Sequence, residues 1–123
     1  MSKTADLDVA RIRAAKNQSL LREVNERIEE LAAVGSSHFE ELQRRRTIDL
    51  ACECMDDTCT ERVTMTIAEY EQIRSEANAF FVRPGHAVAG VEEVVREEGE
   101  YVVVAKIGAG ARVAERLDPR NRT

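Results

Sequence analysis

Three cysteines within eight residues give this chain a set of side chains suited to binding a metal ion. Cys52, Cys54 and Cys59 form a C-x-C-x4-C cluster, and they are the only cysteines among the 123 residues. Thiolate sulfur and imidazole nitrogen are the donors that structural zinc takes in tetrahedral protein sites. His86, which follows a Pro-Gly pair, completes such a set. The sequence therefore predicts a structural Zn²⁺ site of the Cys3His type.

The spacing of the cysteines explains how they can converge. Residues two apart in a strand point to the same face, so Cys52 and Cys54 present both thiols on one side. A turn over residues 55–58 then brings Cys59 back against them. The fourth ligand must come from another segment of the chain, and His86 is favoured because a Pro-Gly turn after a strand can direct it across the fold. The alternatives are His38, Asp56 and Asp57.

Two other interpretations of the cysteine cluster stay open. The thiols could be redox-active or bind an iron–sulfur cluster, or they could be buried without a chemical role. Four protein ligands leave no coordination position for water, which favours a structural over a catalytic zinc. In a reducing cytoplasm, clustered cysteines are interpreted as metal ligands before disulfides, and an odd number would leave one unpaired.

Length and charge limit the class of protein. A chain of 123 residues fits one domain with an appended helix. Its net charge of −5 disfavours binding to nucleic acid, in spite of the run Arg44–Arg46. No apolar run reaches the roughly 20 residues of a membrane span, and the N-terminus lacks the apolar core of a signal peptide. We therefore expect a cytoplasmic protein that does not enter the membrane.

The first third of the chain predicts one long amphipathic helix, about residues 7–34. Apolar and small residues recur at alternating spacings of three and four, with charged residues expected on the opposite, solvent-facing side. The helix would pack on its own domain or form a homodimer. The residues of the predicted stripe are Leu7, Ala10, Ala14, Asn17, Leu21, Val24, Ile28 and Leu31, and those of the charged face are Arg22, Glu23, Glu26, Glu29 and Glu30.

The remainder predicts a small antiparallel sheet with one helix, so the fold class is α+β, cross-linked by zinc. The helix is expected at 67–77, opened by a Thr66–Glu69 capping box, and the apolar run Tyr101–Ile107 predicts a central strand. The expected regions are an N-terminal helical region (1–46), a zinc-stabilised domain (47–107) and a polar, Arg-rich tail (108–123), of which residues 118–122 are expected to be disordered. The other expected strands are 47–52, 62–65, 80–82 and 91–96.

No arrangement of residues predicts an enzyme. Gly108 and Gly110 follow a strand, as in a dinucleotide fingerprint, but Val113 takes the place of the third glycine and too little chain follows. We therefore expect a non-enzymatic, zinc-stabilised module that engages another protein or acts as a regulator. A cysteine-based redox or metal sensor is the first alternative, and a nucleic-acid-binding zinc protein is the second.

Several short motifs together resemble a family of short, uncharacterised proteins from high-GC Gram-positive bacteria. The resemblance implies a bacterial, cytoplasmic protein and supports grouping Cys52, Cys54, Cys59 and His86, and it implies no catalytic residue. The motifs that carry it are Glu23–Ile28, Cys52–Cys54, Cys59, Glu69–Glu71, Ile73-Arg74, Phe81-Val82, Pro84–His86 and Tyr101–Lys106.

Overall fold

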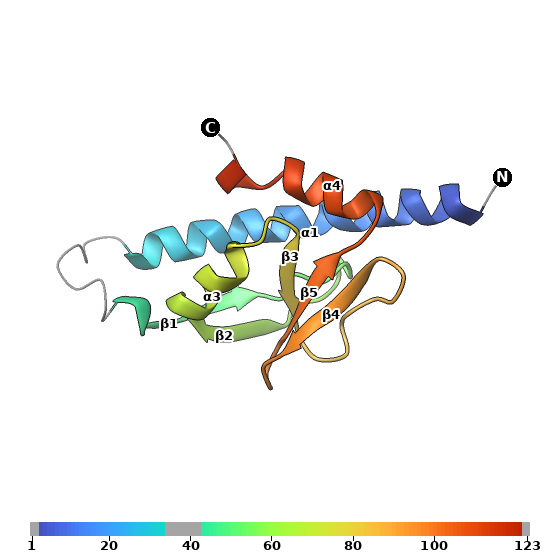
Figure 1. The fold of residues 1–123 in the computed structure, drawn as a ribbon. Coiled ribbons are helices and arrows are strands. Elements are labelled where there is room, and N and C mark those ends of the chain that lie inside the picture. The colour runs from blue at the N-terminus through green and yellow to red at the C-terminus, as the bar shows by residue number, and fades with distance from the viewer. Residues whose placement is uncertain (1–2, 34–42, 122–123) are drawn as a thin grey trace.

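The computed structural model describes residues 3–33 and 43–121 and confirms the α+β class (Figure 1). Among the elements with defined bounds in these residues, a long helix comes first, five short strands and one helix follow, and two helical segments come after the last strand. The elements in chain order are α1 (Lys3–Ala33), β1 (Thr47–Ala51), β2 (Arg62–Thr66), α3 (Ile67–Arg74), β3 (Ala79–Val82), β4 (Glu92–Glu97), β5 (Val102–Lys106), α4 (Ala109–Arg116) and the 3-10 turn η1 (Pro119–Asn121).

The strands form two antiparallel sheets instead of the single sheet expected. One sheet pairs β1 with β2, and the other has the order β3-β5-β4. The central position of β5 confirms the prediction for its apolar run, because Val102, Val103 and Val104 are all buried. β4 lies at the edge, and its Val94 and Val95 are about half exposed, at 46% and 56%.

Aromatic side chains fill the core between α3 and the two sheets. Phe81 of β3 makes edge-to-face contacts with Tyr70 and Tyr101, each with ring centroids 6.2 Å apart. This geometry is favourable because the positive edge of one ring meets the negative face of the next. Tyr70 is held there by α3, whose predicted capping box is present, with Thr66 and Glu69 each bonded to the other's backbone N–H.

Helix α1 packs on the rest of the fold through its polar side, which contradicts the predicted orientation. Three of the apolar side chains of the expected stripe or its border are strongly exposed: Leu20 at 64%, Val24 at 51% and Leu31 at 69%. Three residues of the predicted solvent-facing side, Arg22, Glu26 and Glu29, are buried instead, although Ala14 of the predicted stripe is buried as expected. The buried side chains of α1 are Ala14, Ala15, Gln18, Ser19, Arg22, Asn25, Glu26 and Glu29.

The polar side of α1 is buried because the neighbouring elements supply partners for it. Arg22 is fully buried and donates to the carbonyl oxygens of Ala77, at 2.6 Å, and Ala114, at 2.8 Å. Its guanidinium also lies 4.6 Å from the centroid of the Phe80 ring, a cation–π contact. A buried charge is tolerated only when it is paired in this way, so these contacts fix how α1 sits.

A second set of buried polar contacts joins α1 to the sheet edges. Asn25 exchanges two hydrogen bonds with the backbone of Ala51, at 2.9 and 2.8 Å, and so continues the pairing of β1. Gln18 accepts from the ammonium of Lys106, which is also paired with Glu92 at 2.7 Å. The periodicity of apolar residues does not report these polar contacts. For this reason the sequence predicted that the apolar stripe of α1, and not its polar side, would be buried.

The expected polar tail is folded as far as residue 121: Pro119–Asn121, within the segment 118–122 expected to be disordered, form η1, while residues 122 and 123 lie outside the described residues. Residues 109–116 form α4, which packs alongside α1 (Figure 1). The contact is close because α4 presents small residues: a Cβ built on Gly110 would lie 2.9 Å from the backbone oxygen of Arg11. Gly108 and Gly110 therefore serve a backbone turn and a helix contact. Gly108 has a φ of 60°, in the region that favours glycine.

Replacing Gly110 with alanine is expected to destabilise the fold by about 1–3 kcal/mol, because the added methyl group meets backbone that cannot move freely. In an isolated helix the same change would be stabilising by roughly 1 kcal/mol, so a loss reports the α1–α4 contact. Urea unfolding measures it, with Arg112→Ala on the exposed side of α4 as the control. Unchanged or increased stability of the Gly110→Ala variant would contradict the close packing.

Candidate metal centre

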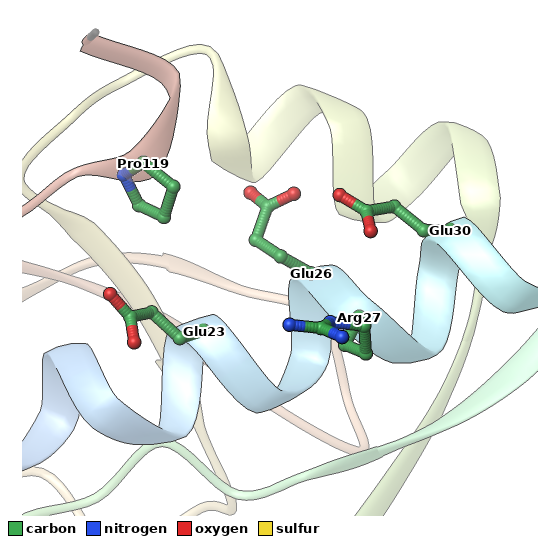
Figure 2. A pocket seen from close by; sticks show the side chains of 5 residues that line it. All are labelled: Glu23, Glu26, Arg27, Glu30 and Pro119. Atoms are coloured by element: carbon green, nitrogen blue, oxygen red, sulfur yellow. The ribbon is translucent and has the colours of Figure 1, made fainter.

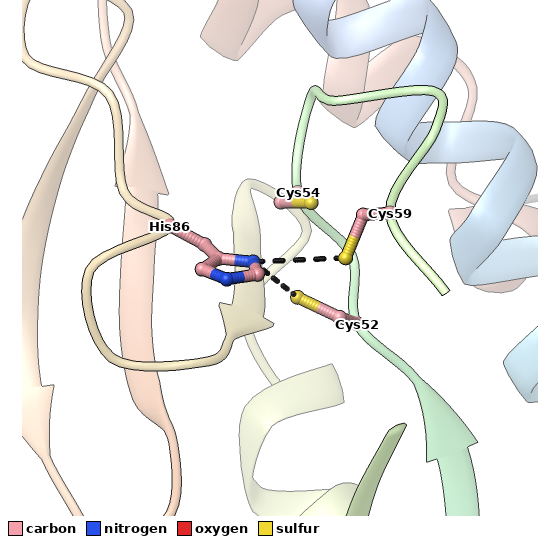
Figure 3. Close-up of side chains that lie close together, drawn as sticks. All are labelled: Cys52, Cys54, Cys59 and His86. Carbon is pink, nitrogen blue, oxygen red and sulfur yellow. Dashed lines mark hydrogen bonds between the residues drawn. The ribbon is translucent and has the colours of Figure 1, made fainter. Parts of the chain in front are cut away.

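The three cysteines and His86 come together between the two sheets (Figure 3). Cys52, Cys54 and Cys59 lie in the connection from β1 to β2, and His86 lies in the connection from β3 to β4. Their ligand atoms all lie within 4.8 Å of one another. The predicted site residues are therefore one cluster, and it joins the connection between β1 and β2 to the connection between β3 and β4.

Two of the distances within the cluster match the edge of a tetrahedral site. His86 Nδ1 lies 3.5 Å from the sulfur of Cys52 and 3.6 Å from that of Cys59. With the usual zinc–sulfur and zinc–nitrogen distances, a tetrahedron has an S···N edge of about 3.6 Å and an S···S edge of about 3.8 Å. The donors therefore need only small movements to close around a single ion.

Backbone contacts hold Cys52 in place as an extension of β1. Its N–H donates to the carbonyl of Glu61 at 3.0 Å, which prolongs the β1–β2 pairing by one residue. The N–H of Arg83 donates to the Cys52 sulfur at 3.2 Å. A hydrogen bond of this kind favours the thiolate, the form that binds metal. The loop after β3 thus supports the site with a backbone donor in addition to the imidazole.

The Pro-Gly turn positions His86 as the sequence predicted. Gly85 has a φ of 88°, a conformation that side chains with a Cβ rarely adopt. The N–H of His86 donates to the carbonyl of Arg83 at 3.0 Å and closes the turn. Directly after β3, this turn brings the imidazole back over the cysteines, as Figure 3 shows.

Burial makes the two inner thiols weak acids in the absence of a cation. Cys52 and Cys54 are 3% and 2% exposed and belong to a core cluster with Phe80 and Val82. Desolvation raises the pKa of both thiols, and the neighbouring sulfurs raise that of Cys52 further. At neutral pH these groups therefore stay protonated until a positive ion compensates the thiolate charge.

Glu53, between two of the cysteines, points the other way and joins the cluster to α1, a role that the sequence analysis missed. Its side chain accepts from Asn25 at 2.9 Å, and its carbonyl accepts from Gln18 at 2.6 Å. Its N–H pairs with the carbonyl of Phe81 at 3.0 Å. Desolvation raises the pKa of this buried carboxyl to about 7, against the hydrogen bonds that lower it. The alternation of strand side chains was the signal for this inward position.

The alternative fourth ligands gain no support. Asp56 accepts from the backbone N–H and the hydroxyl of Thr58, at 3.0 and 2.7 Å, which is turn chemistry. His38 lies outside the described residues.

A separate acidic pocket beside Pro119 is lined by glutamates of α1 (Figure 2). Within residues 3–33 and 43–121, however, the Cys3His set is the one group of three or more ligand-type side chains close enough to hold an ion.

Two further findings concern membrane-spanning helices and similarity to known proteins. In the described part of the chain, no helix has both the length and the apolar character required to cross a bilayer. No protein-family model, no curated protein and no solved structure matches the chain. The resemblance drawn from the short motifs therefore stays a prediction, and the chemistry of the cluster is what carries a functional conclusion.

Proposed function

We propose that Cys52, Cys54, Cys59 and His86 bind a structural Zn²⁺ and that the protein is a non-enzymatic, zinc-stabilised interaction or regulatory module of the bacterial cytoplasm. The observation that carries the proposal is the convergence of four donors from two loops to within 4.8 Å of one another, with two S···N distances at the tetrahedral edge. When bound, the ion would supply cross-linking of the β1–β2 and β3–β4 connections. The four side chains fill its coordination sphere, so they favour a structural site.

The buried position of the thiols favours this function over a redox sensor. A sensor cysteine is an exposed, low-pKa thiolate. Cys52 and Cys54 are instead almost fully buried, and burial raises the pKa of both. Cys59 is partly exposed, but its sulfur, like that of Cys52, contacts Nδ1 of His86. Binding to another protein is also preferred over nucleic acid, because the net charge is −5.

Cobalt substitution tests the proposed coordination. Co²⁺ added to metal-free protein should produce intense visible bands of a tetrahedral ion and a near-ultraviolet band from sulfur-to-cobalt charge transfer. Zinc should displace it stoichiometrically and remove both bands. Because the thiols must lose their protons, the affinity should be weaker at pH 6 than at pH 8.

His86→Ala and His86→Cys are the matched variants for the fourth ligand. The cysteine variant should retain a tetrahedral cobalt spectrum with stronger charge transfer, and the alanine variant should lose tetrahedral coordination or bind more weakly. Pale octahedral cobalt spectra for the unmodified protein would contradict the site. A spectrum unchanged in His86→Ala would remove His86 from it.

A further inference from the structure

The two loops that carry the metal ligands are both bonded to helix α1. Residues 52–61, the cysteine loop, hold the three thiols, and residues 83–91, the histidine loop, hold the imidazole. The side chains of α1 that contact these loops or their flanks include Arg11, Gln18 and Asn25, which are seven residues apart. Seven residues are about two helical turns, so the three side chains lie along one side of the helix. One row of polar groups on α1 therefore faces both loops.

Asn25 binds the residues on both sides of Cys52. It is fully buried, exchanges hydrogen bonds with the backbone of Ala51 and donates to the carboxylate of Glu53 at 2.9 Å. Side chains alternate along an extended chain, and the strand pairing of β1 continues into Cys52. Holding Glu53 against α1 therefore turns Cys52 and Cys54 the other way, toward the metal cluster. Asn25 thus orients two ligands that it does not itself contact.

Gln18 connects the two loops to each other. Its fully buried amide donates to the backbone carbonyl of Glu53, in the cysteine loop, at 2.6 Å and to the carboxylate of Glu92 at 3.1 Å. The second carboxylate oxygen of Glu92 accepts from the N–H of Val88 at 3.0 Å. Val88 lies two residues after His86, so Gln18 reaches the histidine loop through a single carboxylate. The helix thus joins the same two loops that the metal ligands join.

We propose that zinc binding and the docking of α1 are coupled, with Gln18 and Asn25 as positioning residues of the metal site. The docked helix holds both loops in the arrangement in which the four ligands converge, so less chain has to be ordered when the ion binds. In the reverse direction, an ion bound between the loops keeps in place the groups that accept hydrogen bonds from α1. By thermodynamic linkage, each event favours the other by the same factor. The inference rests on the proposed function and names what the zinc regulates, which is whether α1 stays on the fold.

Gln18→Met and Asn25→Leu are each expected to weaken zinc binding by at least about tenfold, the lower end of the effect of groups that orient metal ligands. Both substitutions nearly keep the volume of the side chain and remove its hydrogen bonds. In Gln18→Met the buried Lys106 and Glu92 stay paired with each other, so no charge loses its partner. Competition with a chromophoric zinc chelator measures the dissociation constant of the folded proteins.

Ile73→Val is the control for a general loss of stability. Ile73 of α3 is buried in the core cluster around Tyr70 and Phe81, which contains no metal ligand. Its truncation should destabilise the fold and leave the affinity for zinc within about twofold of that of the unmodified protein. Unchanged affinity in both α1 variants, or an equal loss in Ile73→Val, would overturn the coupling.

Hydrogen exchange in the unmodified chain tests the reverse direction without a substitution. When buffered free zinc is lowered from excess to about the dissociation constant, the amides of α1 between Gln18 and Asn25 should exchange about fivefold faster or more, together with those of the cysteine loop. The amides of α3 should respond less. Exchange in α1 that stays constant while the loop responds, or an equal response in α3, contradicts the coupling.

Metal analysis of the same samples keeps the two proposals apart. Unmodified protein that binds no zinc contradicts the metal site itself. Zinc-loaded protein whose affinity is unchanged by both substitutions, and whose α1 exchange does not depend on zinc, contradicts only the coupling.

Discussion

Cys54→Ser is expected to abolish stable zinc binding and to unfold the β1–β2 and β3–β4 connections. The substituted oxygen is a poor zinc ligand, and Cys54 is 2% exposed at the centre of the cluster. Binding at a structural zinc site contributes on the order of 10–16 kcal/mol at neutral pH, and a small domain is stable by about 5–15 kcal/mol. Loss of the ion thus approaches the whole stability of the domain.

Thermal unfolding and metal analysis on the purified variant measure this effect. Asp57→Asn is the matched control, since Asp57 is exposed in the same loop and lies outside the cluster. It should keep the metal and the melting temperature of the unmodified protein. A Cys54→Ser variant that is folded, metal-free and equally stable would remove the structural role of the site.

Arg74→Met is expected to destabilise the fold by about 3–5 kcal/mol, the usual loss when one member of a buried ion pair is removed. Arg74 of α3 is completely buried and pairs with Glu26 of α1 and Asp118 near the C-terminus. Methionine fills most of the space but leaves two carboxylates with weaker compensation. The ion pairs therefore hold α1 and the segment after α4 to α3.

Urea unfolding compares Arg74→Met with Arg62→Met, an exposed position on β2 that should change stability by less than about 0.5 kcal/mol. The variant Glu26→Gln/Arg74→Met should recover part of the loss, because one unpaired charge is gone. Equal stability of Arg74→Met and Arg62→Met would contradict the role of the buried network.

The candidate site was predictable because local rules determine it. Strand alternation places Cys52 and Cys54 on one face, and the Pro-Gly turn places His86 beside them. Both rules act within a few residues of the ligands. The inward position of Glu53 follows from the same alternation, but its partners on α1 depend on how that helix docks, which local patterns do not specify.

The orientation of α1 and the folding of residues 109–121 could not be predicted for the same reason. Counting apolar residues assigns the buried side of a helix when packing is hydrophobic. Arg22 and Asn25 are buried because backbone carbonyl groups of segments distant in the sequence accept hydrogen bonds from them. The polar sequence after residue 107 likewise folds because small residues of α4 fit closely on α1. Ala15, Ser19 and Arg22 are spaced so that they share the buried side of α1. That side, however, has fewer large apolar residues than the predicted stripe.

The zinc site is measured most directly by the metal content of untagged protein, determined by elemental mass spectrometry, with thiols counted before and after chelation. We expect one zinc per chain and three thiols that react only after the metal is removed. Protein without metal that is fully folded, with its thiols freely reactive, would contradict the zinc site and leave an ordinary α+β domain with buried cysteines.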